Sequence, residues 1–492
     1  MDTVRVNDFL ASKLDCLVIG AAAAGLVIAA LLLFDSNWVV GLVEASLFRK
    51  NAPNTHVIGS TGHRKLRPEQ YDVDARTGFF PAQPLPRLPE VYAVWEQSLA
   101  DARGVLYLAD NRSSEALAAR LDGEKWRADV RSWPVLSVGS LRGDLRHLQR
   151  AHKMLAFILH YYAHSVPKGG QDEPVRIPRS LAIPLAAVSK ELGIAPVLTF
   201  ADTVLWNWDL IDPGRPLSID NMRYVDLLSG SETEASFYKS SAAIELKGAE
   251  MLRIIEHFVN MTTVTSPRAI ADMHHNLQQL KRIVNELTDI FSCIRSIVDP
   301  HVFYWIVRPW WMGAGKLSNG QPGWFFEGVP DYATFDLSGP SGGQSAVMHA
   351  LDIFLDVDHR LSYHRSPAPS EANKKADRGF MERMRRYMPG LHCEYLKRIA
   401  MVQYTVREVA EMAPSVREPY NAVVASLQRL REVHIQVACF YVITQARTTP
   451  PASAGIAAEK LDTKGTSVGT GGNDVASLLK AGRDATHRAM IH

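Results

Sequence analysis

Apolar residues recur at alternating steps of three and four through a long stretch of the second half of the chain. They are Ile270, Met273, Leu277, Leu280, Val284, Leu287, Phe291 and Ile294, and Pro300 follows. This spacing predicts one long helix whose apolar seam packs in a helical bundle, a simpler interpretation than a dimer zipper. Similar helical periods occupy residues 145–164, 239–259 and 419–445, and alternating strand patterns are scarce. The sequence therefore predicts a mainly α fold.

The same patterns suggest a division of the chain into five parts. We expect an N-terminal segment (1–50), a polar, proline-rich approach (51–90), a small α(+β) domain (91–230), a large all-α domain (231–445) and a C-terminal part (446–492). The C-terminal part begins with a stretch that is low in bulky apolar residues, which we expect to be mobile, and it closes with a helix.

Residues 16–34 contain no charged side chain and approach the ~20 residues that a membrane-spanning helix needs. We expect a membrane anchor here, with the bulk of the protein facing the cytosol, because Lys and Arg are denser after the segment. A cleaved signal peptide fits less well, since the preceding residues carry no net positive charge. A dinucleotide-binding loop lacks the acidic residue that should follow it. Without an anchor, the protein is expected to be cytoplasmic.

Composition narrows the classes of function. The formal charge of +2 argues against a strongly basic nucleic-acid binder, and we expect no nucleic-acid partner. The four cysteines lie far apart without a CxxC pair, which makes a disulfide framework or a structural zinc site unlikely and favours a reducing compartment.

The stretch DLSGPSGGQSAVMHALD, residues 336–352, reads as a glycine-rich turn that runs into an apolar helix. A phosphate-binding loop would need Lys followed by Ser or Thr after the last glycine, whereas Gln344 and Ser345 follow Gly343. We therefore expect the small residues to allow a close backbone approach to something flat and bulky.

Several long motifs resemble the indoleamine 2,3-dioxygenase family, in its fungal type, in their order and spacing. They are IPRSLAIPLAAVSKELGIAPVLTFADTVLWNW, FYWIVRPWWMG, SGPSGGQSAVMHALDIFL, RRYMPGLHCEYL, REPYNAVVASLQRLREVHIQ and KGTSVGTGG. The likeness runs from about Phe79 to the C-terminus. It implies a haem b held between a small and a large all-α domain. It also implies insertion of O2 across the indole C2–C3 bond of L-tryptophan to give N-formylkynurenine, the first step of the kynurenine pathway.

The resemblance also implies the partners and the residues around the iron. The partners are L-tryptophan, O2 and a reductant for ferric haem, and we expect a monomer. His392 matches the proximal iron ligand, which suits a haem without covalent attachment, since no CxxCH motif occurs. Asp352 matches an acidic residue that orients that imidazole directly or through water; a salt bridge on the helix surface is the alternative. No side chain is expected as a general base, because the haem iron carries the chemistry.

Arg308 matches the arginine that binds the substrate carboxylate. An arginine inside so apolar a run is costly without an anionic partner. A structural ion pair or a bridge to a haem propionate is the alternative.

The remaining substrate-binding residues come from the same resemblance. Phe303 and Phe237 match aromatic walls, Phe200, Thr203 and Val204 match the inner pocket, Ser241 matches a distal serine, Ser341 and Gly342 match the loop over the haem edge, and Thr470 matches a loop that closes over substrate. Trp311 stands where a smaller aliphatic residue is usual, so its bulk could narrow the pocket. For the phenylalanines, ordinary core packing stays open.

Two other functions stay open at this point. One is a haem protein of the same fold that binds O2 or senses haem with little or no turnover. The other is a non-haem metal enzyme that uses the tetrad from Asp356 to His359, for which a charged loop after a helix is the simplest interpretation.

Overall fold

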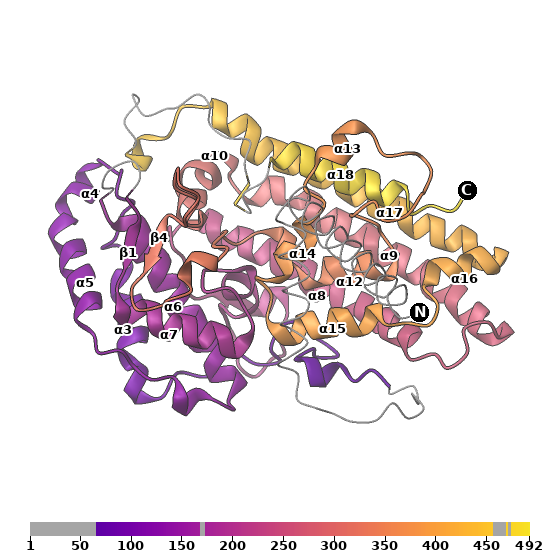
Figure 1. Cartoon of the computed structure of the whole chain (residues 1–492), viewed down its shortest axis with the longest axis horizontal. Coiled ribbons are helices and arrows are strands. Elements are labelled where there is room, and N and C mark those ends of the chain that lie inside the picture. Colours follow the sequence, from indigo (N-terminus) through magenta and orange to yellow (C-terminus); the bar gives the residue numbers. More distant parts are fainter. Residues whose placement is uncertain (1–64, 168–172, 456–468, 471–473) are drawn as a thin grey trace, which may run out of the picture. The chain divides into compact units, whose positions relative to one another are not determined.

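The computed structural model describes residues 65–167, 173–455, 469–470 and 474–492, and these fold mainly into helices (Figure 1). The predicted mainly α fold is confirmed. Strands β1 (Val175–Ile177) and β4 (Trp324–Phe326) pair in parallel, and β2 (Trp208–Leu210) and β3 (Met222–Tyr224) pair antiparallel. The proposed anchor at 16–34 lies outside the described residues.

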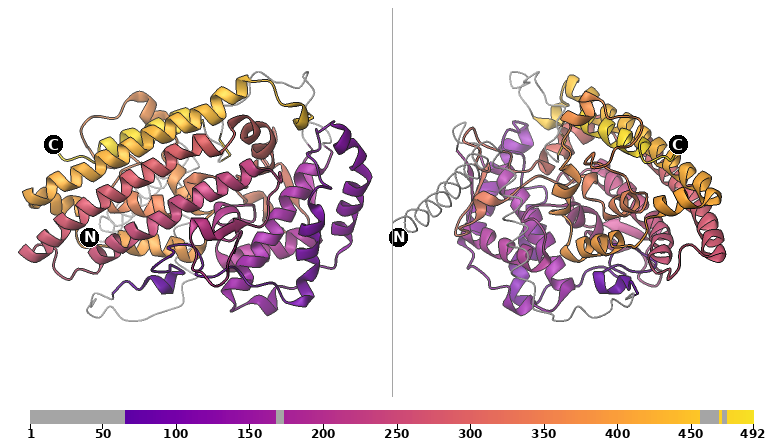
Figure 2. Two further views of the ribbon diagram at one scale, coloured as in Figure 1. Left: turned by 180° about the vertical axis from the view of Figure 1, so that it is seen from behind. Right: turned by 45° about the vertical axis from the view of Figure 1, so that its right-hand side comes forward.

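The helices of the first part of the chain gather on one side of the described structure, in indigo and purple in Figures 1 and 2. They are α3 (Ala93–Ala102), α4 (Ser114–Ala118), α5 (Arg120–Ser132), α6 (Leu145–Ser165) and α7 (Arg179–Leu192). Helix α6 coincides with the predicted helix 145–164 and begins where the Asp144 side chain accepts a hydrogen bond from the His147 amide at 3.0 Å. Its second half is buried almost completely and packs against α3 and α7.

Four other helices form the other side. They are α8 (Glu232–Val259), α9 (Pro267–Ile297), α17 (Pro414–Ala438) and α18 (Val475–His487). Helix α9 packs against both α8 and α17, and α18 lies along α17 (Figure 2). The predicted long helix is thus confirmed as α9, which starts with Ser266 as its cap and Pro267 in its first turn. Most of its seam is buried, with Ile270 and Phe291 partly buried.

Short helices connect these long ones. They are α10 (Pro300–Val302), α11 (Arg308–Trp311), α12 (Ala346–Phe354), α13 (Glu371–Lys375), α14 (Phe380–Arg385), α15 (Gly390–Ala400) and α16 (Val406–Met412). Within the described ranges, no single helix is long and apolar enough to cross a membrane. Helix α9 and the segment Pro300–Trp311 would qualify only together, and they are bent by 87°. Residues Lys65–His492 form one unit, so the proposed domain division within it stays a prediction.

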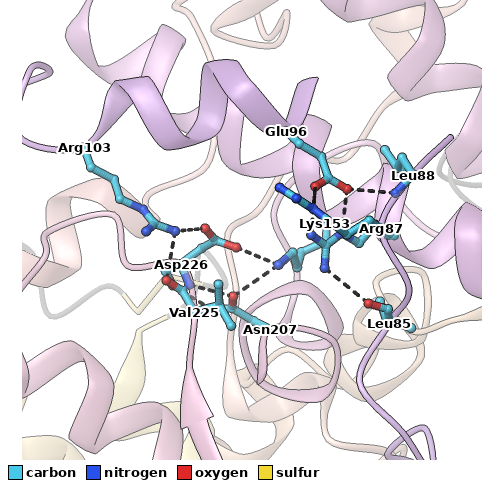
Figure 3. A network of polar contacts seen from close by, with 10 residues as sticks. Leu85, Arg87, Leu88, Glu96, Arg103, Lys153, Asn207, Val225 and Asp226 are labelled. Atoms are coloured by element: carbon cyan, nitrogen blue, oxygen red, sulfur yellow. Dashed lines mark hydrogen bonds and ion pairs between the residues drawn. The ribbon is translucent and has the colours of Figure 1, made fainter. Parts of the chain in front are cut away.

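A buried ion pair links α6 to the residues that flank the β2–β3 strand pair (Figure 3). Lys153 Nζ lies 2.6 Å from Asp226 Oδ2, and Arg103, the residue after α3, also pairs with Asp226. The Asn207 side-chain amide donates to the Asp226 carbonyl oxygen at 2.7 Å. Burial lowers the pKa of Lys153, and the attraction of Asp226 opposes this shift. Through Asn207, the network holds the chain directly after Ala201–Leu205, the turn that carries Thr203.

Two glycines allow the chain after α11 to cross the chain before α12 at close range. A Cβ atom on Gly339 would overlap the Trp311 carbonyl oxygen, and one on Gly313 would overlap the Leu337 carbonyl oxygen. The Ala314 amide donates to that same Leu337 oxygen at 2.9 Å. The crossing holds the glycine-rich loop beside Arg308 and Trp311.

Replacing Gly339 with Ala should therefore destabilise the protein. The added methyl group has to displace backbone, so we expect the free energy of unfolding to fall by about 2 kcal/mol or more. Gly342→Ala, three residues away, is the matched control, because its Cβ would meet no atom within 4 Å. Urea unfolding compares the two variants, and equal stabilities would contradict the close crossing.

Candidate functional site

One cavity of about 380 Å³ lies among α8, α9, α11, α12, α17 and α18. Its volume falls in the range of small-molecule sites. Every substrate-binding residue proposed from the sequence lines it, namely Phe200, Thr203, Val204, Phe237, Ser241, Phe303, Arg308, Trp311, Ser341, Gly342 and Thr470. The structure thus brings together side chains that are up to 270 positions apart in the sequence.

Three π-helical turns border this cavity. They are Ala201–Leu205, Phe303–Val307 and Cys439–Thr444. Such turns insert a residue into a helix, re-aim the side chains and often mark functional sites. Here they bring Thr203, Phe303 and Tyr441 to the cavity wall.

The wall combines aromatic rings with a buried guanidinium. The rings of Phe237 and Phe303 lie 4.9 Å apart, and the Arg308 guanidinium lies 5.2 Å from the centre of the Tyr304 ring. Burial lowers the pKa of Arg308, but a guanidinium starts so high that it stays charged at neutral pH. This part of the wall can therefore receive a flat apolar ring that carries an anionic group.

The glycine-rich loop and Thr470 form another part of the wall. The Thr470 hydroxyl donates to the Pro340 carbonyl oxygen at 2.6 Å, and the Gly339 amide donates to the Thr470 carbonyl oxygen at 3.2 Å. Two of the glycines in this loop have a packing role that the sequence interpretation did not assign to them. Gly339 packs against backbone and Gly343 against the Phe380 ring, whereas a Cβ on Gly342 would meet open space.

Asp352 of α12 pairs with Arg431 of α17. Arg431 Nη2 lies 2.7 Å from Asp352 Oδ2, and His359 Nε2 lies 2.8 Å from the same oxygen. Burial alone would raise the pKa of Asp352, but Arg431 and His359 outweigh it and hold the pKa well below its ordinary value. Asp352 is therefore an ionised partner of Arg431, and it is not in contact with His392.

Besides His359, which is paired with Asp352, the cavity wall carries the imidazole of His434, which the sequence interpretation missed. It follows Arg431 by three residues on α17, and its ring lies 5.0 Å from that of Phe291 on α9. Burial, with a smaller contribution from the nearby Arg431 charge, lowers the pKa of His434 to about 4. The neutral ring has the form that binds a metal ion. Among the described residues no hydrogen bond engages this ring, so its nitrogens are available to a ligand.

A signal for His434 was present in the sequence. The residues Tyr420, Val423, Leu427, Leu430, Val437 and Tyr441 follow the spacing of three and four, and all are buried. His434 takes the seam position between Leu430 and Val437. A lone polar residue in an otherwise apolar seam needs a partner, and here the part of the seam from Leu430 to Tyr441 lines the cavity.

The structure does not bring His392 to this cavity. His392 lies on α15, completely buried, with its ring 4.7 Å from Phe79 and its Nε2 4.0 Å from Asp72 Oδ2. Both ring nitrogens lack a hydrogen-bond partner among the described residues. His392 is therefore enclosed by the chain and does not line the cavity that Arg308 and His434 share.

The tetrad from Asp356 to His359 does not form a metal site. Asp356 pairs with Arg365, and His359 pairs with Asp352. In the ranges that the structure describes, no group of three or more His, Cys, Asp or Glu side chains could hold a metal ion. The alternative of a non-haem metal centre therefore has no support there.

The family model described as indoleamine 2,3-dioxygenase matches residues 67–489. The chain belongs to this family. Indoleamine 2,3-dioxygenase 1 of Rattus norvegicus is 28% identical over 445 residues, covering 89% of this chain and 99% of the relative. An indoleamine 2,3-dioxygenase of Aspergillus candidus is 30% identical, covering 85% and 96%. A 6-hydroxytryptophan 2,3-dioxygenase of Fusarium equiseti is 27% identical, covering 85% and 96%.

Membership of the indoleamine 2,3-dioxygenase family makes the chain a haem-dependent dioxygenase, an oxidoreductase. The cavity fits this assignment, because a neutral imidazole, a buried guanidinium and an aromatic wall share one space.

A buried carboxyl group also lies on the cavity wall. Glu245 of α8 accepts a hydrogen bond from the Ser345 hydroxyl, while its Oε2 has no partner among the described residues. Burial raises the pKa of Glu245 to about 7, and the Ser345 hydrogen bond offsets this only in part. Glu245 is therefore partly protonated near neutral pH, where an exposed glutamate is fully ionised.

Replacing Glu245 with Gln should remove a pH-dependent cost of folding. In the unfolded chain Glu245 loses its proton near pH 4.5, whereas in the folded protein it keeps the proton up to about pH 7. The free energy of unfolding therefore falls as the pH rises through this interval. The free energy of unfolding of Glu245→Gln minus that of the unsubstituted protein should be about 3 kcal/mol larger at pH 8 than at pH 4.5. Urea unfolding at both pH values measures the gain, and Glu232→Gln, at the exposed start of α8, is the control. A difference that does not change with pH would contradict the assignment.

Proposed function

We propose that the protein binds haem b through His434 and opens the pyrrole ring of L-tryptophan with O2, giving N-formylkynurenine. The observation that carries this proposal is the presence of a neutral imidazole and a buried guanidinium on one largely aromatic cavity. The names of the relatives support an indole substrate, although one of them acts on 6-hydroxytryptophan.

Haem iron, when bound, supplies the activation of O2. His434 would hold the iron through a ring nitrogen. Asp352 would act through Arg431, whose position on α17 fixes the helix face that carries His434. The sequence interpretation had Asp352 orient the imidazole directly or through water, whereas in this proposal Asp352 acts through Arg431.

The chain itself would bind and orient the substrate. Arg308 binds the carboxylate, and Phe237 and Phe303 contact the indole ring. The Ser241 hydroxyl donates to the Phe237 carbonyl oxygen at 3.0 Å, so its lone pairs remain to accept a hydrogen bond from the substrate ammonium. Thr470 closes the cavity next to Pro340 and excludes water. The catalytic contribution of the protein is therefore positioning, without a side chain that acts as a general base.

Substitution of the two histidines tests the iron ligand. His434→Ala should lose the Soret absorption of the haem-loaded protein, whereas His392→Ala should retain it. Imidazole added to His434→Gly should restore the band, because it can occupy the space of the missing side chain. Retention of haem by His434→Ala together with its loss from His392→Ala would reverse the assignment.

Arg308→Gln tests how the substrate is held. The charge-assisted hydrogen bonds to a carboxylate contribute about 1.5–3 kcal/mol, so kcat/KM for L-tryptophan should fall roughly 10- to 150-fold. For tryptamine, which lacks the carboxylate, the same substitution should change kcat/KM about twofold at most. Equal losses for both substrates would show that Arg308 has a structural role.

Formation of N-formylkynurenine tests the reaction itself. The haem-loaded protein, incubated with L-tryptophan, ascorbate and methylene blue, should develop the absorbance of this product. Absence of product from both L-tryptophan and 6-hydroxy-L-tryptophan, at full haem loading, would favour the alternative of a haem protein that binds O2 without turnover.

A further inference from the structure

Trp311 lies beside Arg308 on the same face of a short helix. The two residues are three positions apart on α11, a spacing that places side chains next to each other. Trp311 is only 4% exposed, and it lines the cavity together with Arg308. A ligand whose anionic group binds Arg308 therefore has the Trp311 indole as an immediate neighbour.

The Trp311 ring is held by aromatic contacts. It stacks on Tyr238 at 5.4 Å with an angle of 15° between the rings. Phe237 lies 5.1 Å away and Phe303 lies 5.5 Å away, the latter edge to face. Phe237 and Phe303 are also cavity residues, so the three rings form one continuous wall.

A buried polar contact fixes the orientation of the same ring. The indole N–H of Trp311 donates to Glu234 Oε1 at 3.4 Å. Glu234 is itself completely buried and accepts hydrogen bonds from the Leu228 and Ser229 amides and from the Tyr238 hydroxyl. Rotation of Trp311 would break both the stack on Tyr238 and the contact with Glu234. The wall beside Arg308 is therefore rigid and cannot move aside for a larger ligand.

We propose that Trp311 sets the upper limit on the size of the substrate ring, so that the cavity accepts an unsubstituted indole and rejects tryptophans with a substituent on the benzene ring. The inference rests on the proposed function, since it takes the substrate to be an indole amino acid held by Arg308. A rigid apolar wall discriminates against one added methyl group by about 10- to 200-fold in kcat/KM.

The neighbouring Trp310 offers a matched control. It is also buried, at 5% exposure, but its ring packs 5.4 Å from Tyr161 and it does not line the cavity that the described residues enclose. Trp310→Leu removes the same number of atoms from the next position of the chain. A general loss of packing should lower the stability of both Trp310→Leu and Trp311→Leu. The preference among substrates should change in Trp311→Leu only.

The experiment compares L-tryptophan with its 4-, 5-, 6- and 7-methyl derivatives on the haem-loaded protein. In Trp311→Leu, the kcat/KM of at least one methyl derivative relative to L-tryptophan should rise about tenfold or more, and the ring position that gains identifies the edge facing residue 311. Trp310→Leu should leave all these ratios within about twofold. Unchanged ratios in Trp311→Leu would overturn the proposal.

Two additions keep the result interpretable. Trp311→Phe retains a ring against Tyr238, so it provides a smaller replacement with a similar expected gain should the leucine variant fail to fold. Calorimetric Kd values for the same compounds do not depend on turnover. An unsubstituted protein that binds L-tryptophan without forming product would refute the proposed reaction, while the Kd ratios of the variants would still decide the role of Trp311.

Discussion

The buried ion pair between Asp352 and Arg431 joins helices from three distant parts of the chain. Asp352 comes from α12 and Arg431 from α17, and Arg431 Nη1 donates to the Gly482 carbonyl oxygen of α18 at 2.6 Å. Loss of one partner would leave a buried charge uncompensated, so the pair favours a single arrangement of these helices. The face of α17 that carries His434 is fixed by this contact.

The other side of the cavity depends on backbone geometry. Gly313 and Gly339 let two segments approach without side chains between them, and Thr470 is hydrogen-bonded to the same loop. Arg308 and Trp311 lie immediately before this crossing. The closely packed loop thus borders the aromatic wall formed by Phe237, Phe303 and Trp311, so backbone contacts support this side of the cavity.

The sequence predicted what depends on local periodicity. The seam from Ile270 to Ile294 specified α9, because spacings of three and four place side chains on one helix face. The resemblance supplied the pocket residues, and the fold brings them together. The π-helical turn at Phe303 and the crossing at Gly339 could not be predicted, because both depend on contacts between segments far apart in the chain. The domain division and the 16–34 anchor stay predictions.

The choice between His392 and His434 shows why burial alone does not identify an iron ligand. Burial lowers the pKa of each to about 4, so both rings are neutral at physiological pH and both could bind a metal ion. The difference lies in the neighbourhood. Phe79 and the chain around Asp72 enclose His392, whereas His434 faces a space bounded by Phe291 and shared with Arg308. A planar cofactor needs that open space beside its ligand, and His434 has it.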